Sequence, residues 1–398
     1  MNWHLITDQQ RFKELLTGWA STKTLALDTE FMRVNTFNPQ VALLQLNINQ
    51  KIYLIDPLAI DTVALGLGEL LANPHSLKIL HACSEDIEVL FYKYPQARIH
   101  NIFDTQIGLA FLGYGLQVGY QKALKECLNI DISKAETRSD WLARPLSNEQ
   151  LQYAASDVEH LPALYDFIAN RLRDKGLFDY CQEDSLLMLK EGAPVPYLKT
   201  LYQQFSNAWQ FDRRQLLLLK NLAMWREASA RLHDIPRTFV LKNHTLLAMV
   251  QKRPHTLAQL SRIEDLHPRT YQKHGPMLLE MIKAAQHHPI QQCPSLLPLP
   301  LPKSAKSLFD VLRQKTEKIA QQHHIPADVL LRKRWLDALV LGYIDEGENF
   351  TLPLALQGWR YEMLTVPLLE ILASQRQHLL KWRQYRHRLD DSVEPAFN

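Results

Sequence analysis

The chain has 398 residues, 46% of them hydrophobic and 22% charged, with a formal net charge of +3 at pH 7, which is typical of a soluble globular protein with two or three domains. Its four cysteines are far apart and form no CxxC pair, which argues against a disulfide framework and a structural zinc site. The first residues lack a basic start followed by an apolar stretch, and no apolar run approaches the length of a membrane span, so we expect a cytoplasmic protein.

The first third of the chain alternates between strand-like and helix-like stretches. The candidate strands are 24–31, 41–46, 52–55, 77–81 and a short one near 99–103. Short polar turns separate the first three strands, which predicts an antiparallel meander. The later strands are joined through a helix-like stretch, 84–94, as in a parallel crossover. We therefore expect a mixed sheet with helices on its faces.

Acidic residues stand out at three places in this part of the chain. Asp28 and Glu30 lie two apart in the first strand-like stretch, so both side chains project from one face. Asp86 falls in the crossover helix. Tyr153 and Asp157 lie four apart, on one face of a later helix. Carboxylates that meet at a strand end form an oxygen-only site of the kind that binds Mg²⁺ or Mn²⁺.

Structural explanations remain open for some of these residues. Asp86 could be a carboxylate that is favoured in the first turn by the helix dipole. Tyr153 could be a core tyrosine whose hydroxyl group is satisfied. The pair Asp28 and Glu30 is hard to explain in this way, because like charges on one strand face repel.

The helix that carries Tyr153 has clear boundaries in the sequence. Ser147 can act as its N-cap, and Gln150, three residues later, completes a capping box. Pro162 falls inside the helical pattern, so we expect a kink or break just before it. Outside this helix, Asp104 is better interpreted as an N-cap than as a metal ligand, and His81 as a structural histidine.

Beyond about residue 191 the strand pattern disappears. Residues 208–287 read as amphipathic helices, and a spacer with five prolines, 289–302, precedes a second helical segment. A shift of 90 residues aligns Ile235-Pro236 with Ile325-Pro326 and continues over sixteen positions. The two segments therefore read as copies of one helical unit.

Charge is distributed unevenly between these parts. The net charge is −7 over residues 1–198, +8 over 199–290 and +5 over 303–388. An acidic first part joined to basic helical parts suggests that the helical parts hold a polyanion. Solvated helix faces would carry the same charges, and this alternative also remains open.

Four stretches of the first half together resemble the ribonuclease D family: DTEFMRVNTFNPQVALLQL, HACSEDIEVL, FDTQIGLAFLGYGLQVGYQKAL and KAETRSDWLARPLSNEQLQYAASDV. That family belongs to the DEDDy 3′→5′ exonucleases, named for four acidic metal ligands and a tyrosine. Matched residue by residue, the resemblance implies that the catalytic set consists of four acidic metal ligands and one tyrosine: Asp28, Glu30, Asp86, Asp157 and Tyr153. The stretch LLLLKNLAMWREASARLHDIPRTFVLKNHTLLAMV resembles the HRDC (helicase and ribonuclease D C-terminal) domain.

The resemblance implies an α/β exonuclease domain with a ribonuclease-H-like mixed sheet, followed by two all-α, HRDC-like domains. The expected boundaries are 1–198 for the exonuclease domain, 199–289 for the first HRDC domain, 290–302 for the proline-rich linker, 303–388 for the second, diverged HRDC-like domain and 389–398 for the tail.

The implied activity is that of a 3′→5′ exoribonuclease that uses two divalent cations, Mg²⁺ or Mn²⁺, and releases 5′-mononucleotides. By the family's pattern Asp28 bridges both ions, and Glu30 and Asp157 hold the ion that carries the nucleophile. Asp86 helps to fix the second ion through water, and Tyr153 orients the attacking water. The implied partners are tRNA precursors and other small structured RNAs. We expect the enzyme to be a monomer and to have no membrane partner.

Further substrate contacts are less strongly indicated. Phe31 could stack on the terminal base, or it could be a core aromatic on the opposite strand face. Lys134 and Arg138 could contact phosphate.

A single-strand DNA exonuclease on the same fold is the alternative activity, since a metal site acts on the phosphate of either polymer. A non-catalytic RNA-binding adaptor is another alternative, but it would predict the loss of an acidic ligand, and none is lost.

Overall fold

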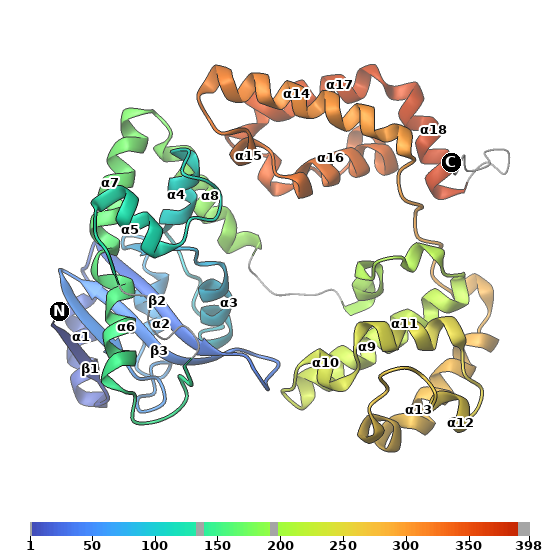
Figure 1. Cartoon of the computed structure of the whole chain (residues 1–398), viewed down its shortest axis with the longest axis horizontal. Helices are drawn as coiled ribbons and strands as arrows, with labels where there is room; N and C mark the ends of the chain where they lie inside the picture. The colour runs from blue at the N-terminus through green and yellow to red at the C-terminus, as the bar shows by residue number, and fades with distance from the viewer. Residues whose placement is uncertain (1, 133–138, 192–197, 389–398) are drawn as a thin grey trace. The chain divides into compact units, whose positions relative to one another are not determined.

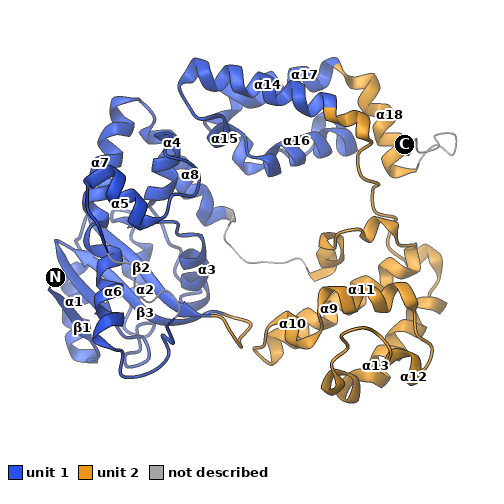
Figure 2. Ribbon diagram, viewed as in Figure 1, with its two compact units in different colours: residues 1–32, 39–194, 307–374 blue, residues 33–38, 195–306, 375–398 orange. Residues whose placement is uncertain are grey.

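The computed structural model describes residues 2–132, 139–191 and 198–388 (Figure 1). Contacts divide the chain into two compact units (Figure 2). The first unit contains residues 1–32, 39–194 and 307–374, and the second contains 33–38, 195–306 and 375–398. Most of the predicted second helical domain, 303–388, is thus grouped with the sheet. The domain boundaries expected from the sequence remain predictions.

A six-stranded mixed sheet forms the centre of the first unit. The strands are β1 (Trp3–Ile6), β2 (Thr24–Met32), β3 (Gln40–Ile48), β4 (Lys51–Ile55), β5 (Leu77–Leu80) and β6 (Ile102–Asp104). Their order is β1-β4-β3-β2-β5-β6. β2, β3 and β4 form the predicted antiparallel meander, and β5 and β6 add in parallel, as the crossover pattern indicates. β1 was not predicted: only one of its four residues is buried, so it carries no alternating pattern.

Helices cover both faces of this sheet. They are α1 (Gln9–Trp19), α2 (Leu67–Ala72), α3 (Ser84–Lys93), α4 (Thr105–Phe111), α5 (Tyr120–Leu128), α6 (Asn148–Glu159), α7 (Leu161–Asp174) and α8 (Phe178–Glu191). Figure 1 shows α6 lying across the sheet. The predicted capping box of α6 is confirmed: the Ser147 side chain accepts from the Gln150 backbone N–H, and the Gln150 side chain accepts from the Ser147 backbone N–H. The break before Pro162 is also confirmed, because α6 ends at Glu159 and α7 starts at Leu161.

The first unit also includes a helical segment from near the C-terminus. Its helices are α14 (Lys306–His323), α15 (Ala327–Leu330), α16 (Lys333–Glu346), η7 (Tyr361–Thr365) and α17 (Val366–Ser374). The ring of Trp359 stacks on Tyr180 of α8, with ring centroids 4.6 Å apart and an interplanar angle of 9°. The Trp359 indole N–H also donates to Asp184 of α8 at 2.9 Å. Aromatic and polar contacts therefore join this segment to the helix that follows α7.

The second unit is helical. Its helices are α9 (Arg213–Leu232), α10 (Arg237–Val240), α11 (Asn243–Lys252), α12 (Leu257–Leu260), α13 (Pro268–His287) and α18 (Arg376–His387). Leucines from α9, α11 and α13, together with Met249, Val250 and Ile282, make up most of its buried core.

The two helical segments contain the predicted repeat. α10 starts at Arg237 and α15 at Ala327, while α11 starts at Asn243 and α16 at Lys333, so the shift of 90 residues relates both pairs. Among the described residues, no helix is both long and apolar enough to cross a bilayer.

Candidate active site

Three carboxylates meet on the face of the sheet that α6 covers. Asp28 and Glu30 lie on β2, and Asp157 lies on α6. Each offers an oxygen that lies within 4.8 Å of the oxygens of the other two. The alternation of β2 brings the first two side chains to one face, and the position of α6 adds the third. The predicted neighbours therefore do come together in space.

Asp86 approaches the same place from the other side of the sheet. Thr29 lies between Asp28 and Glu30 and so points to the opposite face, where its hydroxyl donates to the Asp86 carboxylate on α3. β5 pairs with β2 only as far as Ala26, so the edge of β2 beyond that residue is not covered by β5. Asp86 lies outside the set of three, yet its charge raises the pKa of Asp28.

Burial, together with the charges of nearby carboxylates, raises the pKa of all four carboxylates. Loss of solvent, followed by the charges of Asp157 and Asp86, raises the pKa of Glu30 to about 8. Loss of solvent likewise raises the pKa of Asp157 to about 7 and that of Asp86 to about 6, although hydrogen bonds from Tyr153 and Thr29 oppose these two shifts. The pKa of Asp28 also lies well above its usual value, mainly through burial.

The donor set fits a hard divalent cation. Every neighbouring charge that contributes to these four pKa shifts is another carboxylate. Carboxylates that are partly buried together at this distance repel one another, and a cation among them removes the repulsion. Oxygen-only ligands favour Mg²⁺ or Mn²⁺ over zinc.

Tyr153 lies one helical turn before Asp157, and the Tyr153 hydroxyl donates to the Asp157 carboxylate. Burial, and then the negative charges of Asp157, Glu30 and Asp28, hold the pKa of Tyr153 far above its usual value. The hydroxyl group therefore keeps its proton at neutral pH. It can orient a neighbouring water by hydrogen bonding, and it cannot act as a charged base.

Two polar neighbours of the cluster were missed in the sequence. Gln45 on β3 pairs directly with Asp28 across the ladder, is fully buried, and has no hydrogen-bond partner for either amide atom among the described residues. Tyr120 lies close enough for the charges of Asp157 and Asp28 to contribute to raising its hydroxyl pKa, although burial contributes more. The sequence does offer a signal for Gln45, which is a polar residue within the apolar run VALLQLNI. Nothing in the sequence indicates a role for Tyr120 near the cluster.

The other predicted residues have varied positions. Asp104 caps α4 by accepting from the Gln106 backbone N–H, as expected. His81 hydrogen bonds to Thr105 and to the Val118 carbonyl, as expected of a structural histidine. Phe31 is partly buried against the apolar core, which favours the structural interpretation, and its contact with a terminal base stays a prediction. Lys134 and Arg138 lie outside the described residues.

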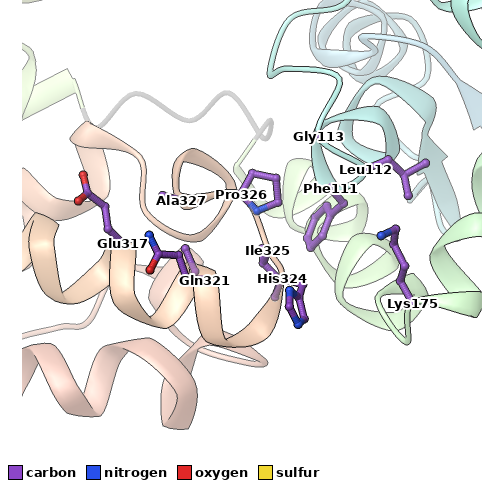
Figure 3. Close-up of a pocket in the computed structure, with 11 residues that line it drawn as sticks. Phe111, Leu112, Gly113, Lys175, Glu317, Gln321, His324, Ile325, Pro326 and Ala327 are labelled. Atoms are coloured by element: carbon purple, nitrogen blue, oxygen red, sulfur yellow. The ribbon is translucent and has the colours of Figure 1, made fainter.

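The first unit also contains a shallow cleft of about 540 Å³ that is separate from the carboxylates. Phe111 and Lys175 line one side of it, and Glu317, His324 and Pro326 line the other (Figure 3). No candidate catalytic residue lines this cleft, so it is not the active site.

Comparisons with known proteins agree with this geometry. Residues 3–173 match a 3′-5′ exonuclease family, and residues 215–282 match the HRDC domain. The chain is 37% identical to ribonuclease D of Pseudomonas paraeruginosa over 93% of its own length and 97% of the relative. It is 31% identical to ribonuclease D of Escherichia coli, over 94% of its own length and 99% of the relative.

The crystal structure of Escherichia coli RNase D, described as an exoribonuclease involved in structured RNA processing, is similar over 94% of this chain and 99% of that one. The TM-score is 0.88 at 30% identity, so the likeness extends beyond the exonuclease part through the helical segments. Full-length similarity, the mixed sheet and the carboxylate cluster lead to one conclusion. The chain belongs to the ribonuclease D family of 3′→5′ exoribonucleases.

Proposed function

We propose that the enzyme hydrolyses RNA from its 3′ end by a two-metal mechanism in which four carboxylates hold the ions: Asp28, Glu30, Asp86 and Asp157. The main support is the approach of three carboxylates to within 4.8 Å at the edge of β2, with the fourth on α3. When bound, two Mg²⁺ or Mn²⁺ ions would activate water at neutral pH and stabilise the departing 3′ oxygen.

The protein side chains have distinct parts in this proposal. Asp28 is central, since the charges of Glu30, Asp86 and Asp157 all act on it, and this supports a bridging position. The protonated Tyr153 hydroxyl, next to Asp157, would orient the attacking water. Attack at the terminal phosphodiester would break the bond to the 3′ oxygen and release a 5′-mononucleotide.

We further propose that the substrates are structured RNAs, tRNA precursors among them, whose 3′ ends the enzyme matures. The support is the described role of the similar Escherichia coli enzyme and the net charge of +8 over residues 199–290. A basic region attracts any polyanion, and RNA is distinguished from DNA only by contacts to the 2′-hydroxyl.

The test is a gel time course on a 5′-labelled RNA hairpin with a single-stranded 3′ tail, with a DNA of matched sequence alongside. Each is incubated with Mg²⁺, with Mn²⁺ and with chelator. Stepwise shortening of the RNA alone, lost with chelator, is the expected result. Equal shortening of the DNA would favour a general exonuclease, and a gel shift without shortening would favour a binding protein.

A further inference from the structure

The ring of Tyr153 has a close aromatic neighbour that the proposed mechanism does not use. Trp141 lies in the turn that precedes α6, and its ring centroid is 6.0 Å from that of Tyr153, with an interplanar angle of 39°. Trp141 is only 3% exposed, although it belongs to no helix or strand. Aromatic side chains with centroids about 4.5–7 Å apart contact each other directly. The indole therefore limits the positions that the Tyr153 ring can take.

Trp141 is held in this place through Arg144, three residues later. The Trp141 carbonyl accepts from an Arg144 Nη at 2.8 Å. The same guanidinium donates to both carboxylate oxygens of Asp56, at 2.6 and 2.9 Å, and to the Ala42 carbonyl on β3 at 2.7 Å. A bidentate pair of this kind is both strong and directional. Because Asp56 directly follows β4, one arginine connects the backbone of the tryptophan to two neighbouring strands.

A second tie joins the same turn to the start of α6. The Gln150 side-chain oxygen accepts from the Ser147 backbone N–H at 2.9 Å, and Gln150 Nε2 donates to the Asp140 carbonyl at 3.3 Å. The Asp140 carboxylate in turn accepts from the Leu142 backbone N–H at 3.0 Å. The residue before the tryptophan is thus fixed to the helix that carries the tyrosine.

The proposed role of Tyr153 requires a fixed ring. Its hydroxyl donates to the Asp157 carboxylate, which holds the outer end of the side chain. The ring itself can still turn about its two side-chain torsions unless a neighbour blocks it. A group that orients water has to stay in the productive geometry, because a misplacement of about 1 Å can cost about 100-fold in rate. The contact with Trp141 supplies the restraint that the hydrogen bond alone does not.

We propose that Trp141 is a positioning residue for Tyr153, and that the Arg144–Asp56 ion pair keeps Trp141 in place. The inference rests on the proposed function, in which the Tyr153 hydroxyl orients the attacking water. Trp141 acts through the tyrosine and contacts neither the substrate nor the metal ions in this proposal. Removal of the indole should therefore lower kcat only while the Tyr153 hydroxyl is present.

The test is a double-mutant cycle in the full-length protein, with Mg²⁺ and a labelled single-stranded RNA, below the melting temperature of every variant. Trp141→Leu should lower kcat by about 10- to 100-fold and leave KM within about two-fold of wild type. In a Tyr153→Phe background the same substitution should change kcat by less than about two-fold, because the hydroxyl that it positions is gone. An unchanged kcat in Trp141→Leu, or equal losses in the two backgrounds, would overturn the proposal.

Trp19→Leu is the matched control. Trp19 on α1 is 5% exposed, and its ring packs against Tyr53 with centroids 4.8 Å apart, so the substitution likewise removes a buried indole from a tyrosine. Its melting temperature should fall, as that of Trp141→Leu should, while kcat at the assay temperature stays that of wild type. An equal fall in kcat for Trp19→Leu would assign the effect to lost stability and would contradict a positioning role.

Two further substitutions keep the test decisive if Trp141→Leu does not fold. Trp141→Phe retains an aromatic ring and should lower kcat by less, again only when the Tyr153 hydroxyl is present. Arg144→Lys keeps the charge and loses the bidentate fork, so it should lower kcat in the same way. A wild-type kcat in Arg144→Lys would remove the ion pair from the proposal, and a Trp141→Phe loss that persists in the Tyr153→Phe background would refute the role of Trp141.

Fluorine NMR of the protein labelled with fluorotyrosine separates this inference from the proposed function, because it needs neither metal nor substrate. The Tyr153 signal is the one that is absent from Tyr153→Phe. In chelator, Trp141→Leu should shift this signal toward that of free fluorotyrosine and narrow it, since the ring moves faster, whereas Trp19→Leu should leave it in place. A signal that neither moves nor narrows in Trp141→Leu would show that the indole does not hold the ring. If wild type fails to shorten RNA, the proposed hydrolysis fails, and the NMR signal still decides whether Trp141 positions Tyr153.

Discussion

Arg360 and Asp184 form a buried ion pair, although they lie 176 residues apart in the chain. The two guanidinium Nη atoms lie 2.6 and 2.5 Å from the two carboxylate oxygens. Arg360 is 1% exposed, and its guanidinium lies 4.8 Å from the ring centroid of Trp335 and 4.1 Å from that of Trp359. The pair thus fixes the C-terminal helical segment to α8, within one unit.

Removing one partner of this pair should be strongly destabilising. Arg360→Met would leave the Asp184 carboxylate buried without its counter-charge, a change that costs about 3–5 kcal/mol. The free energy of unfolding, followed by circular dichroism in urea, measures the effect. Arg313→Gln is the control, because it breaks an exposed pair with Asp310 and should cost less than about 1 kcal/mol. A similar, small loss in both variants would show that the buried pair does not hold the unit together.

Asp28→Asn should abolish hydrolysis and yet stabilise the metal-free protein. Activity should fall by at least about 100-fold, because the substitution removes a central negative charge on which stabilisation of the transition state depends. The melting temperature in chelator should rise, since a desolvated carboxylate that Asp86, Asp157 and Glu30 repel is replaced by a neutral amide. Asp166→Asn, at an exposed position on α7, is the matched control and should change neither quantity. A lower melting temperature for Asp28→Asn would contradict the repulsion argument.

The metal-free protein should lose stability as the pH rises from about 5 to about 8. Glu30, Asp157 and Asp86 have pKa values in the folded state of about 8, 7 and 6, all above their ordinary values. In this pH window the folded state binds more protons than the unfolded state, so the free energy of unfolding falls with rising pH. Saturating Mg²⁺ should reduce this dependence, because bound cations replace the protons. Melting curves in chelator and in Mg²⁺ test both statements, and parallel pH profiles would refute the second.

Tyr153→Phe should lower kcat while leaving divalent-ion affinity close to that of wild type. A positioned group in proton transfer contributes about 10²–10⁴-fold to the rate. The phenol is not one of the oxygens of the carboxylate cluster, so ion binding by calorimetry should persist. Tyr165→Phe, which removes the hydroxyl from a tyrosine packed against Phe103, is the control and should retain wild-type kcat. Loss of ion binding in Tyr153→Phe would indicate a ligand role in place of an orienting one.

Local patterns in the sequence predicted much of the sheet and the main cluster. The spacing of Asp28 and Glu30 on a strand, and of Tyr153 and Asp157 on a helix, indicates a shared face in each case, and the structure has both. The capping box at Ser147 fixed where that helix begins, because it depends on residues three positions apart.

Contacts between distant segments could not be predicted in the same way. Gln45 is opposite Asp28 only because β2 and β3 pair in one register, and a shift of one residue would turn it to the other face. Asp184 and Arg360 carry no local pattern that relates them. β1 was missed because it is short and mostly exposed, so its sequence has no alternating pattern. It is a strand only through its pairing with β4.

The helical repeat gives Arg360 an equivalent position in the first helical segment. The shift of 90 residues relates Thr270 to Arg360 and Val240 to Leu330. The Thr270 hydroxyl donates to the Val240 carbonyl at 3.3 Å, and Arg360 Nε donates to the Leu330 carbonyl at 3.1 Å. Arg360 therefore contacts the same backbone position of the repeat as Thr270 does, and it also reaches Asp184. A single arginine side chain thus ties its own helical segment and α8 together, so that the two cannot separate without exposing or orphaning a buried charge.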